Sequence, residues 1–374
     1  MISRIRIATG LVLFVFVFFH LINLAFGLVS LHALEQARPI LTGPWANPVG
    51  GTVLLACVLV HAGLGLWSLF QRTQIRLNSG DFIQAIMGVA IIPLLLPHIM
   101  ATAVAPAITD ATPSYTWVLA VYWLRAPNLG MQQVLALMVI WIHACYGLLL
   151  WIQVQPWWGR YGLLVYPLAL IIPVAALLGF IEAGKEIYFN QTAPAIADPI
   201  RDTAALYEPV APTLWDVHDV ILATYAILLA VLILARLIRN ARSRRNVAVS
   251  YDGGPAITDR SGPQLLELAR NHDILHASLC GGRGRCGSCA VRVLEGMDNL
   301  PPADDTEKAT LARIKAGPDI RLACQAAPIS GTVRVERIFP AHLTPSDYRE
   351  LLTTDDPVEV AHAMNRAAMG EAMA

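Results

Sequence analysis

Four of the six cysteines lie close together in the C-terminal third of the chain. Three of them have the spacing C-x5-C-x2-C, and the fourth lies further downstream; they are Cys280, Cys286, Cys289 and Cys324. Four thiolates, two on each iron, are the usual ligands of a [2Fe–2S] cluster. Structural zinc is the alternative, but zinc sites usually combine two C-x-x-C pairs, and only one pair here has that spacing. The pattern therefore favours a [2Fe–2S] cluster.

The gaps between the first three cysteines are rich in glycine. Four glycines lie there, namely Gly281, Gly282, Gly284 and Gly287. Glycines permit the unusual backbone dihedrals with which a loop wraps around a cluster and points its N–H groups at the sulfur atoms. The two other cysteines, Cys57 and Cys145, lie in apolar runs, where a free cysteine usually behaves as a small hydrophobic residue. We assign them no chemical role.

Four histidines form a second candidate set, one in each of four successive apolar segments. They are His20, His61, His98 and His143. A histidine inside a membrane is costly and is a functional candidate by default. Hydrogen bonding to a neighbouring helix is the structural alternative for any one of them. Their regular placement favours two bis-histidine haem b sites, because each haem iron takes two imidazoles from facing helices of a bundle.

The sequence around these histidines repeats. His20 and His98 are 78 residues apart, His61 and His143 are 82 apart, and both members of the second pair begin the motif H-A-x-x-G-L. The first four apolar segments therefore resemble a duplicated hairpin. The motif places Gly65 and Gly147 one helical turn after a histidine, on the same face, where a porphyrin edge can approach the backbone. Close helix packing is the other explanation for these glycines.

Depth in the membrane predicts how the histidines pair. Counted from the cytoplasmic end of each segment, His61 and His143 lie nearer the surface than His20 and His98 do on average. We therefore expect an inner haem on His61 and His143 and an outer haem on His20 and His98. The pairs come from segments 2 and 4 and from segments 1 and 3, which face each other across an up-and-down bundle.

The elements that position these residues follow from hydropathy. The mean hydropathy is +0.54 and only 14% of the 374 residues are charged, which is too apolar for an ordinary soluble protein. Six stretches are long enough to cross a bilayer: 7–31, 49–70, 82–105, 131–154, 162–183 and 217–239. The first is too long for a signal-peptide core and lacks a cleavage site, so we expect it to be retained. The net charge of zero predicts no nucleic-acid partner.

Arginines in the short loops predict the orientation. One side of the membrane collects Arg4, Arg6, Arg72, Arg76, Arg160, Arg236, Arg239, Arg242, Arg244 and Arg245. The other side has Arg38, Arg125, Lys185 and Arg201 among many acids. We therefore expect both termini, and the cysteine-rich part, on the cytoplasmic face of the inner (plasma) membrane.

The predicted fold class is an all-α transmembrane bundle followed by an α+β domain. We expect the bundle at 1–245, an iron–sulfur domain at 246–340 and a polar tail at 341–374. Alternating patterns predict strands at Val247–Tyr251, Ala290–Leu294 and Thr332–Arg337, and a helix at Gln264–Asn271. The stretches 280–293 and 322–325 closely resemble the ferredoxin superfamily with the vertebrate-type spacing. This resemblance implies a β-grasp fold and the four clustered cysteines as cluster ligands.

Residues 1–180 resemble the di-haem cytochrome b anchors of succinate dehydrogenase and fumarate reductase. That resemblance implies a quinone site beside a haem. Polar residues at the outer rim are candidates for it, although ordinary interfacial anchoring is the simpler role: Glu35, Trp123, Arg125, Glu182 and Lys185. His32 and His218 lie at the outer ends of their segments and are more simply interfacial.

Residues 1–340 resemble the membrane regulatory region of redox-regulated bacterial class III adenylate cyclases. The resemblance rests on the run 280–293, then Leu300-Pro301-Pro302, then Arg321–Gln325. It implies a six-helix di-haem anchor followed by a ferredoxin domain. Only 34 residues follow residue 340, which is too few for a cyclase domain, so cyclase activity is not expected from this chain.

These patterns predict a membrane electron-transfer or redox-sensing protein with lipid and quinone as partners. No P-loop and no G-x-G-x-x-G motif follows a strand, so we name no catalytic residue. A cyclase or another signalling partner fits the sensing function. An electron-transfer component of a quinone-linked oxidoreductase and a non-redox transporter with proton-relaying histidines are the alternatives. The oligomeric state, including a homodimer, stays open.

Overall fold

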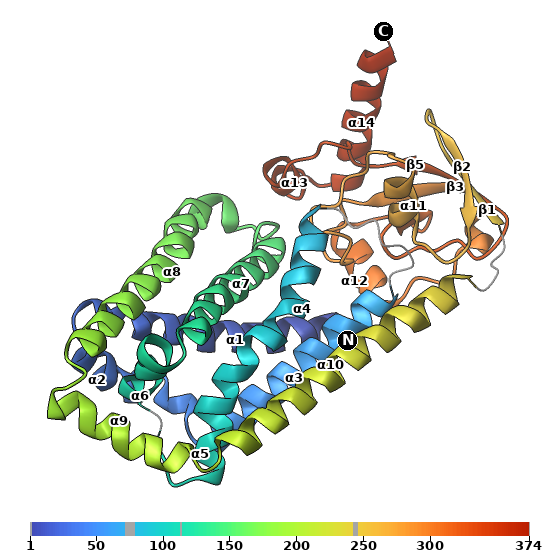
Figure 1. Cartoon of the computed structure of the whole chain (residues 1–374). Helices are drawn as coiled ribbons and strands as arrows, with labels where there is room; N and C mark the ends of the chain where they lie inside the picture. The colour runs from blue at the N-terminus through green and yellow to red at the C-terminus, as the bar shows by residue number, and fades with distance from the viewer. Residues whose placement is uncertain (1, 72–78, 113, 242–245, 374) are drawn as a thin grey trace.

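The computed structural model describes residues 2–71, 79–112, 114–241 and 246–373. The chain forms a helical bundle and, against one end of it, a domain built on a mixed sheet (Figure 1). Arg72, Arg76, Arg242, Arg244 and Arg245, which contribute to the predicted orientation, lie outside the described residues.

Six helices of the described chain are long and apolar enough to cross a membrane, as the sequence predicts. They are α1 (Ile2–Ala25), α3 (Pro48–Gln71), α4 (Ser79–Ile99), α7 (Pro127–Ile152), α8 (Trp158–Phe189) and α10 (Ala211–Ala241). The span that begins in α4 continues through a π-helical turn, η3 (Met100–Val104), into α5 (Ala105–Ile108).

Three shorter helices, which the hydropathy pattern does not predict, cover the end of the bundle away from the sheet domain (Figure 1). They are α2 (Leu31–Leu41), α6 (Tyr115–Ala120) and α9 (Pro194–Tyr207). The side chains of Ser30 and Ser114 cap α2 and α6 by accepting a hydrogen bond from the third residue along. Fully buried residues such as Leu34 and Leu119 then pack these helices against α8.

The sheet has five strands in the order β2-β1-β5-β3-β4. Their bounds are β1 (Asn246–Tyr251), β2 (Ala256–Arg260), β3 (Ala290–Glu295), β4 (Ile320–Leu322) and β5 (Thr332–Arg337). β1 pairs parallel with β5, and the other neighbours pair antiparallel. The strands expected at 247–251, 290–294 and 332–337 are confirmed, and so is the helix before the cysteines, α11 (Leu265–Asn271).

A buried ion pair ties the helix α12 (Asp305–Arg313) to β4. Arg321 donates two hydrogen bonds of 2.9 Å to the carboxylate of Glu307, which is only 1% exposed. The same carboxylate accepts a 2.7 Å hydrogen bond from the backbone N–H of Leu322. A charged pair in the interior is tolerated when hydrogen bonds satisfy it in this way. The pair holds the chain just before Cys324.

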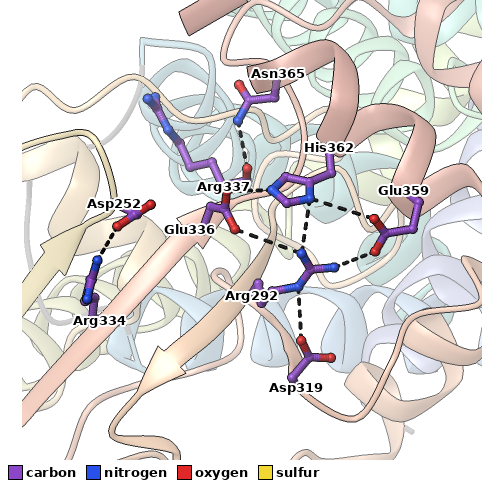
Figure 2. Close-up of polar contacts among 9 residues, drawn as sticks. All are labelled: Asp252, Arg292, Asp319, Arg334, Glu336, Arg337, Glu359, His362 and Asn365. Carbon is purple, nitrogen blue, oxygen red and sulfur yellow. Dashed lines mark hydrogen bonds and ion pairs between the residues drawn. The ribbon is translucent and has the colours of Figure 1, made fainter. Parts of the chain in front are cut away.

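The segment after residue 340, expected as a polar tail, contains two helices, α13 (Pro345–Leu351) and α14 (Pro357–Met373). Figure 2 shows how α14 is attached to the sheet. Arg292 of β3 reaches Glu359 on α14 at 2.5 Å and Asp319 at 3.0 Å, and the buried ring of His362 lies 2.6 Å from Glu336. Charge and burial thus fix α14 on the domain.

The bundle and the sheet domain are in direct contact. The side chain of Gln153, which follows α7, donates a 2.8 Å hydrogen bond to the backbone oxygen of Leu279. Arg349 of α13 donates one of 2.8 Å to the backbone oxygen of Gln153. Val154 is 6% exposed because it packs into the core of the sheet domain. These contacts set the cysteine-rich loop over the end of the bundle.

Candidate iron–sulfur and haem sites

The four clustered cysteines converge inside the sheet domain. None is more than 1% exposed, and none of the four takes part in a disulfide. A side-chain hydrogen bond with Cys286 lowers the pKa of Cys280 well below its usual range, and one with Cys324 raises the pKa of Cys289. The thiols therefore meet two by two. This arrangement fits a cluster of two irons with two thiolates on each.

Residues 280–289, which carry three of the cysteines, form the cluster loop. Its backbone has the unusual dihedral angles that its glycines predict. Gly281, Gly282, Gly284 and Gly287 all have positive φ angles, of 67, 79, 66 and 97°. At Gly287 a side chain is excluded by space as well, because an added Cβ would lie 2.9 Å from Cγ2 of Ile314. The loop can therefore wrap around a cluster without strain.

Polar groups next to the thiols hold the loop. The side chain of Gln325 donates a 3.3 Å hydrogen bond to the sulfur of Cys324, and the hydroxyl of Ser288 lies 3.1 Å from the sulfur of Cys286. The backbone oxygen of Cys286 accepts from Arg313 at 3.0 Å and also from the hydroxyl of the buried Tyr348 of α13. Hydrogen bonds of this kind orient ligands and tune the potential of a cluster.

The four histidines of the bundle lie in two facing pairs. The ring centres of His61 and His143 are 6.3 Å apart, and those of His20 and His98 are 6.1 Å apart. A metal–imidazole bond of about 2 Å, with roughly 1.1 Å from nitrogen to ring centre, puts two rings on one metal about 6 Å apart. Each pair is therefore spaced for one metal ion between its rings.

Backbone carbonyls select the tautomer of the inner pair, His61 and His143. Nδ1 of His61 lies 3.1 Å from the backbone oxygen of Arg6, and Nδ1 of His143 lies 3.2 Å from that of Gln84. A carbonyl oxygen only accepts, so Nδ1 carries the proton in both rings and Nε2 keeps a lone pair, which in His143 lies 3.5 Å from the side-chain nitrogen of Gln84. In the outer pair, His20 and His98, Nδ1 of His98 lies 3.2 Å from the hydroxyl of Tyr122.

The missing backbone N–H of Pro97, the residue before His98, shapes the helix around that histidine. Pro97 has no N–H, so the backbone oxygen of Pro93 lacks its helical donor. The side chain of Gln132 on α7 donates to that oxygen at 3.2 Å and to the oxygen of Leu94 at 3.1 Å. The irregular end of α4 is thereby fixed against α7.

Two glycines that the sequence analysis does not single out, Gly10 and Gly88, support the rings of the inner pair. An added Cβ at Gly10 would lie 2.9 Å from Cε1 of His61, and one at Gly88 would lie 3.0 Å from Cε1 of His143. Each ring thus rests on the bare backbone of the neighbouring helix. The sequence does hold a signal for these two glycines, because each precedes a histidine of the outer pair, His20 or His98, by ten residues.

A continuous cavity of about 2550 Å³ connects the two sites. All four paired histidines line it, and at its other end so do Gly281, Gly282, Arg283 and Arg285 of the cluster loop. Ordinary ligand pockets measure about 300–1,000 Å³, so there is room for more than one large group. Gly65 and Gly147 also line the cavity, and at Gly65 an added Cβ would meet nothing within 4 Å.

The rim residues proposed for quinone are not brought to this cavity. Glu182 pairs with Lys185 at 2.9 Å and Arg125 with Glu208 at 3.1 Å, all largely exposed. Glu35 pairs with Arg38 at 3.3 Å, and of these residues only Arg38 lines the cavity. Surface pairs of this kind fit interfacial anchoring. Their positions do not locate a quinone site.

The end of the cavity next to the cluster loop is basic. Burial, with the neighbouring charges of Arg283 and Arg6, lowers the pKa of Arg285 to about 10. Arg6 belongs to α1 and the other two belong to the cluster loop, so positive charge from both parts of the chain gathers at this junction.

Comparisons with known proteins identify the sheet domain. A family described as "2Fe-2S iron-sulfur cluster binding domain" matches residues 252–328. A component of the Na(+)-translocating NADH-quinone reductase of Yersinia enterocolitica is 32% identical over 113 residues, which are 29% of this chain and 27% of that protein. The Histophilus somni protein of the same name is 34% identical over 112 residues, 28% of this chain and 26% of its own.

The chain thus spans about a quarter of the length of these relatives. The crystal structure of the ISC-like [2Fe–2S] ferredoxin from Pseudomonas putida is 28% identical and covers 27% of this chain and 96% of its own, with a TM-score of 0.23. From the family match and the apolar helices, the chain combines six candidate membrane helices with a [2Fe–2S] ferredoxin domain.

Proposed function

We propose that the chain is a membrane electron-transfer protein in which two b haems and the [2Fe–2S] cluster form one conduction path. The observation that carries this proposal is the continuous cavity lined by both histidine pairs and by the cluster loop. When bound, haem iron and a [2Fe–2S] cluster each exchange single electrons. Two imidazoles fill only two positions of a six-coordinate iron, and a porphyrin supplies the other four.

In this proposal His61 and His143 hold the inner haem, and His20 and His98 hold the outer one. The carbonyl groups of Arg6 and Gln84 keep Nδ1 protonated, so that Nε2 of each inner ring points its lone pair at iron. Gly65 and Gly147, which line the cavity, leave space beside a porphyrin edge. Most of the side chains that line the cavity are apolar.

We further propose that the ferredoxin domain and both termini face the cytoplasm, with the bundle ending at 245, the ferredoxin domain at 340, and α13 and α14 packed onto that domain. The arginine-rich loops support this orientation, because positive residues stay on the cytoplasmic side. The ferredoxin domain lies at the end of the bundle where α10 ends in Arg236 and Arg239.

Two biological uses are compatible with such a path. Contacts of α13 favour redox sensing: Tyr348 bonds to the carbonyl of the cluster ligand Cys286, and Arg349 bonds to the loop after α7. The C-terminal helices therefore touch both the cluster loop and the bundle, where they could report to a signalling partner, as in the cyclase regulatory regions that the sequence resembles. The relatives named as parts of an NADH-quinone reductase favour the second use, electron transfer within a quinone-linked oxidoreductase.

A reduced-minus-oxidised optical spectrum of the purified full-length protein, with haem and iron counted per chain, tests the proposal. We expect two b-type haems and two non-haem irons. His20→Ala should remove haem, whereas His32→Ala, at an exposed position in α2, should not. Cluster iron without haem would refute the haem part of the proposal and leave the helices as an anchor or transporter-like bundle.

The two uses are separated by steady-state turnover. A quinol analogue with a soluble one-electron acceptor should be turned over continuously by a component of an oxidoreductase. A sensor should instead be reduced about once per chain and then stop, unless its partner is added.

A further inference from the structure

The junction between the bundle and the cluster loop concentrates positive charge in a partly enclosed space. Five arginines line this end of the cavity, against the acids Glu267 and Asp304. They are Arg6, Arg239, Arg270, Arg283 and Arg285. All five are only half-exposed, so water screens their charges less than it would at an open surface. Such a concentration of guanidinium groups attracts anions.

Arg6 links this basic end to the inner histidine pair. Its backbone oxygen accepts the hydrogen bond from Nδ1 of His61, so the residue begins at the level of that ring. Side chains on a helix lean toward its N-terminus. The N-terminal end of α1 is the end near the sheet domain (Figure 1), and Arg6 lines the same cavity as Arg285 of the cluster loop.

The chemistry at this position calls for an anion with more than one acidic oxygen. Guanidinium groups bind carboxylates and phosphates through paired, charge-assisted hydrogen bonds. A haem held between His61 and His143 carries two carboxylates on one edge of its ring, and a lipid headgroup is the other source of anionic oxygens near a membrane surface.

We propose that Arg6 and Arg285 bind the carboxylates of the inner haem, so that the porphyrin docks the ferredoxin domain onto the bundle. This inference rests on the proposed function, because it needs a haem on His61 and His143. Its consequence is that the haem edge and the loop bearing Cys280 and Cys286 are joined by the same arginines. Arg283, whose guanidinium also donates to the carbonyl of Cys280 at 2.8 Å, lies beside them.

The test compares haemin with haemin dimethyl ester, which has the same ring and iron but no carboxylates. Full-length protein made without haem, in a His20→Ala background that leaves only the inner site, is titrated with each compound in a neutral detergent. We expect haemin to bind about tenfold or more tightly than the ester, as charge-assisted hydrogen bonds predict. Arg285→Gln and Arg6→Gln should each lower that ratio at least threefold, and the double variant should bring it close to one.

Arg160→Gln is the matched control. Arg160 lies at the start of α8 over the ring of Tyr161, is exposed, and does not line the cavity. It should leave the haemin-to-ester ratio unchanged. A second readout is the midpoint potential of the haem. Loss of the positive charge of Arg6 or Arg285 should shift the ratio of oxidised to reduced haem about tenfold toward the ferric form at a fixed potential, which is ~59 mV for one electron.

The outcomes separate this inference from the proposed function. Equal binding of haemin and ester by the parent protein overturns the inference while the haem proposal stands. Equal binding together with tighter haem binding after anionic phosphatidylglycerol is added, abolished in Arg285→Gln, would assign the arginines to lipid headgroups and overturn it as well. Failure to bind either compound, in a protein with an intact cluster spectrum, refutes both. Because Arg6 lies outside the cluster domain, Arg6→Gln keeps the test valid if Arg285→Gln loses its cluster.

Discussion

The two imidazole pairs make opposite predictions for two kinds of double variant. The ring centres lie 6.3 Å apart for His61 and His143 and 6.1 Å apart for His20 and His98. Alanine at one member should remove the low-spin haem of its own pair and leave the other haem in place. Each single variant should therefore keep one of two haems, or about half of the reduced-minus-oxidised absorbance.

Double variants make the distinction sharp. His61→Ala with His143→Ala should still keep one haem, because both changes strike the same site. His61→Ala with His98→Ala should keep none, because one change strikes each site. Haem is measured as its pyridine complex and divided by cluster iron, which corrects for folding. Equal haem in the two double variants would refute the pairing, and a single variant that loses both haems would refute independent sites.

Individual contacts lead to three other predictions. Gly10→Ala or Gly88→Ala should displace a ring and cost the inner haem, whereas Gly51→Ala, whose added Cβ comes no closer than 3.9 Å to another group, should not; equal haem content in all three would contradict the packing argument. Glu307→Gln should leave Arg321 charged, buried and unpaired, and should destabilise the ferredoxin domain by about 3–5 kcal/mol in urea unfolding followed by cluster absorbance, with the exposed Glu350→Gln as control. Burial lowers the pKa of His276 to about 4, so between pH 6.5 and 4 the unfolded chain binds the extra proton and stability should fall as the pH falls, by up to about 1.4 kcal/mol per pH unit. A His276→Gln variant with an unchanged slope over that range would show that another group is responsible.

Local sequence signals are sufficient to predict the cluster loop and the spans. The spacing of Cys280, Cys286 and Cys289 with its glycines already determines a loop that can wrap around a cluster, because all its parts are close in sequence. The six apolar runs are equally clear, because length and hydropathy are local properties. Even the facing of His61 and His143, and of His20 and His98, follows from depth, since membrane thickness gives a common scale to separate helices.

Features that depend on contacts between distant segments could not be predicted. Gly10 and Gly88 matter because a ring from another helix rests on each, and their position ten residues before His20 and His98 does not by itself reveal that contact. The helices α2, α6 and α9 are short, and their stability comes from packing on α8 rather than from a long apolar run. Tyr348 belongs to a polar stretch without a recognisable motif, yet its hydroxyl bonds to the carbonyl of Cys286.

The repeated halves of the bundle differ at one informative position. Arg6 in α1 and Gln84 in α4 are equivalent: each lies four residues before the glycine that supports a ring, and each gives its backbone oxygen to that ring's Nδ1. Their side chains differ. That of Gln84 donates a 3.1 Å hydrogen bond to the backbone oxygen of His143, whereas the positive charge of Arg6 helps to lower the pKa of Arg285. Positioning of the imidazoles requires only the backbone oxygen and is the same in both halves. The charge is present in only one of the two halves, at the end of the cavity that Arg283 and Arg285 of the cluster loop also line. This is expected if the charge serves the junction with the ferredoxin domain and not the imidazoles themselves.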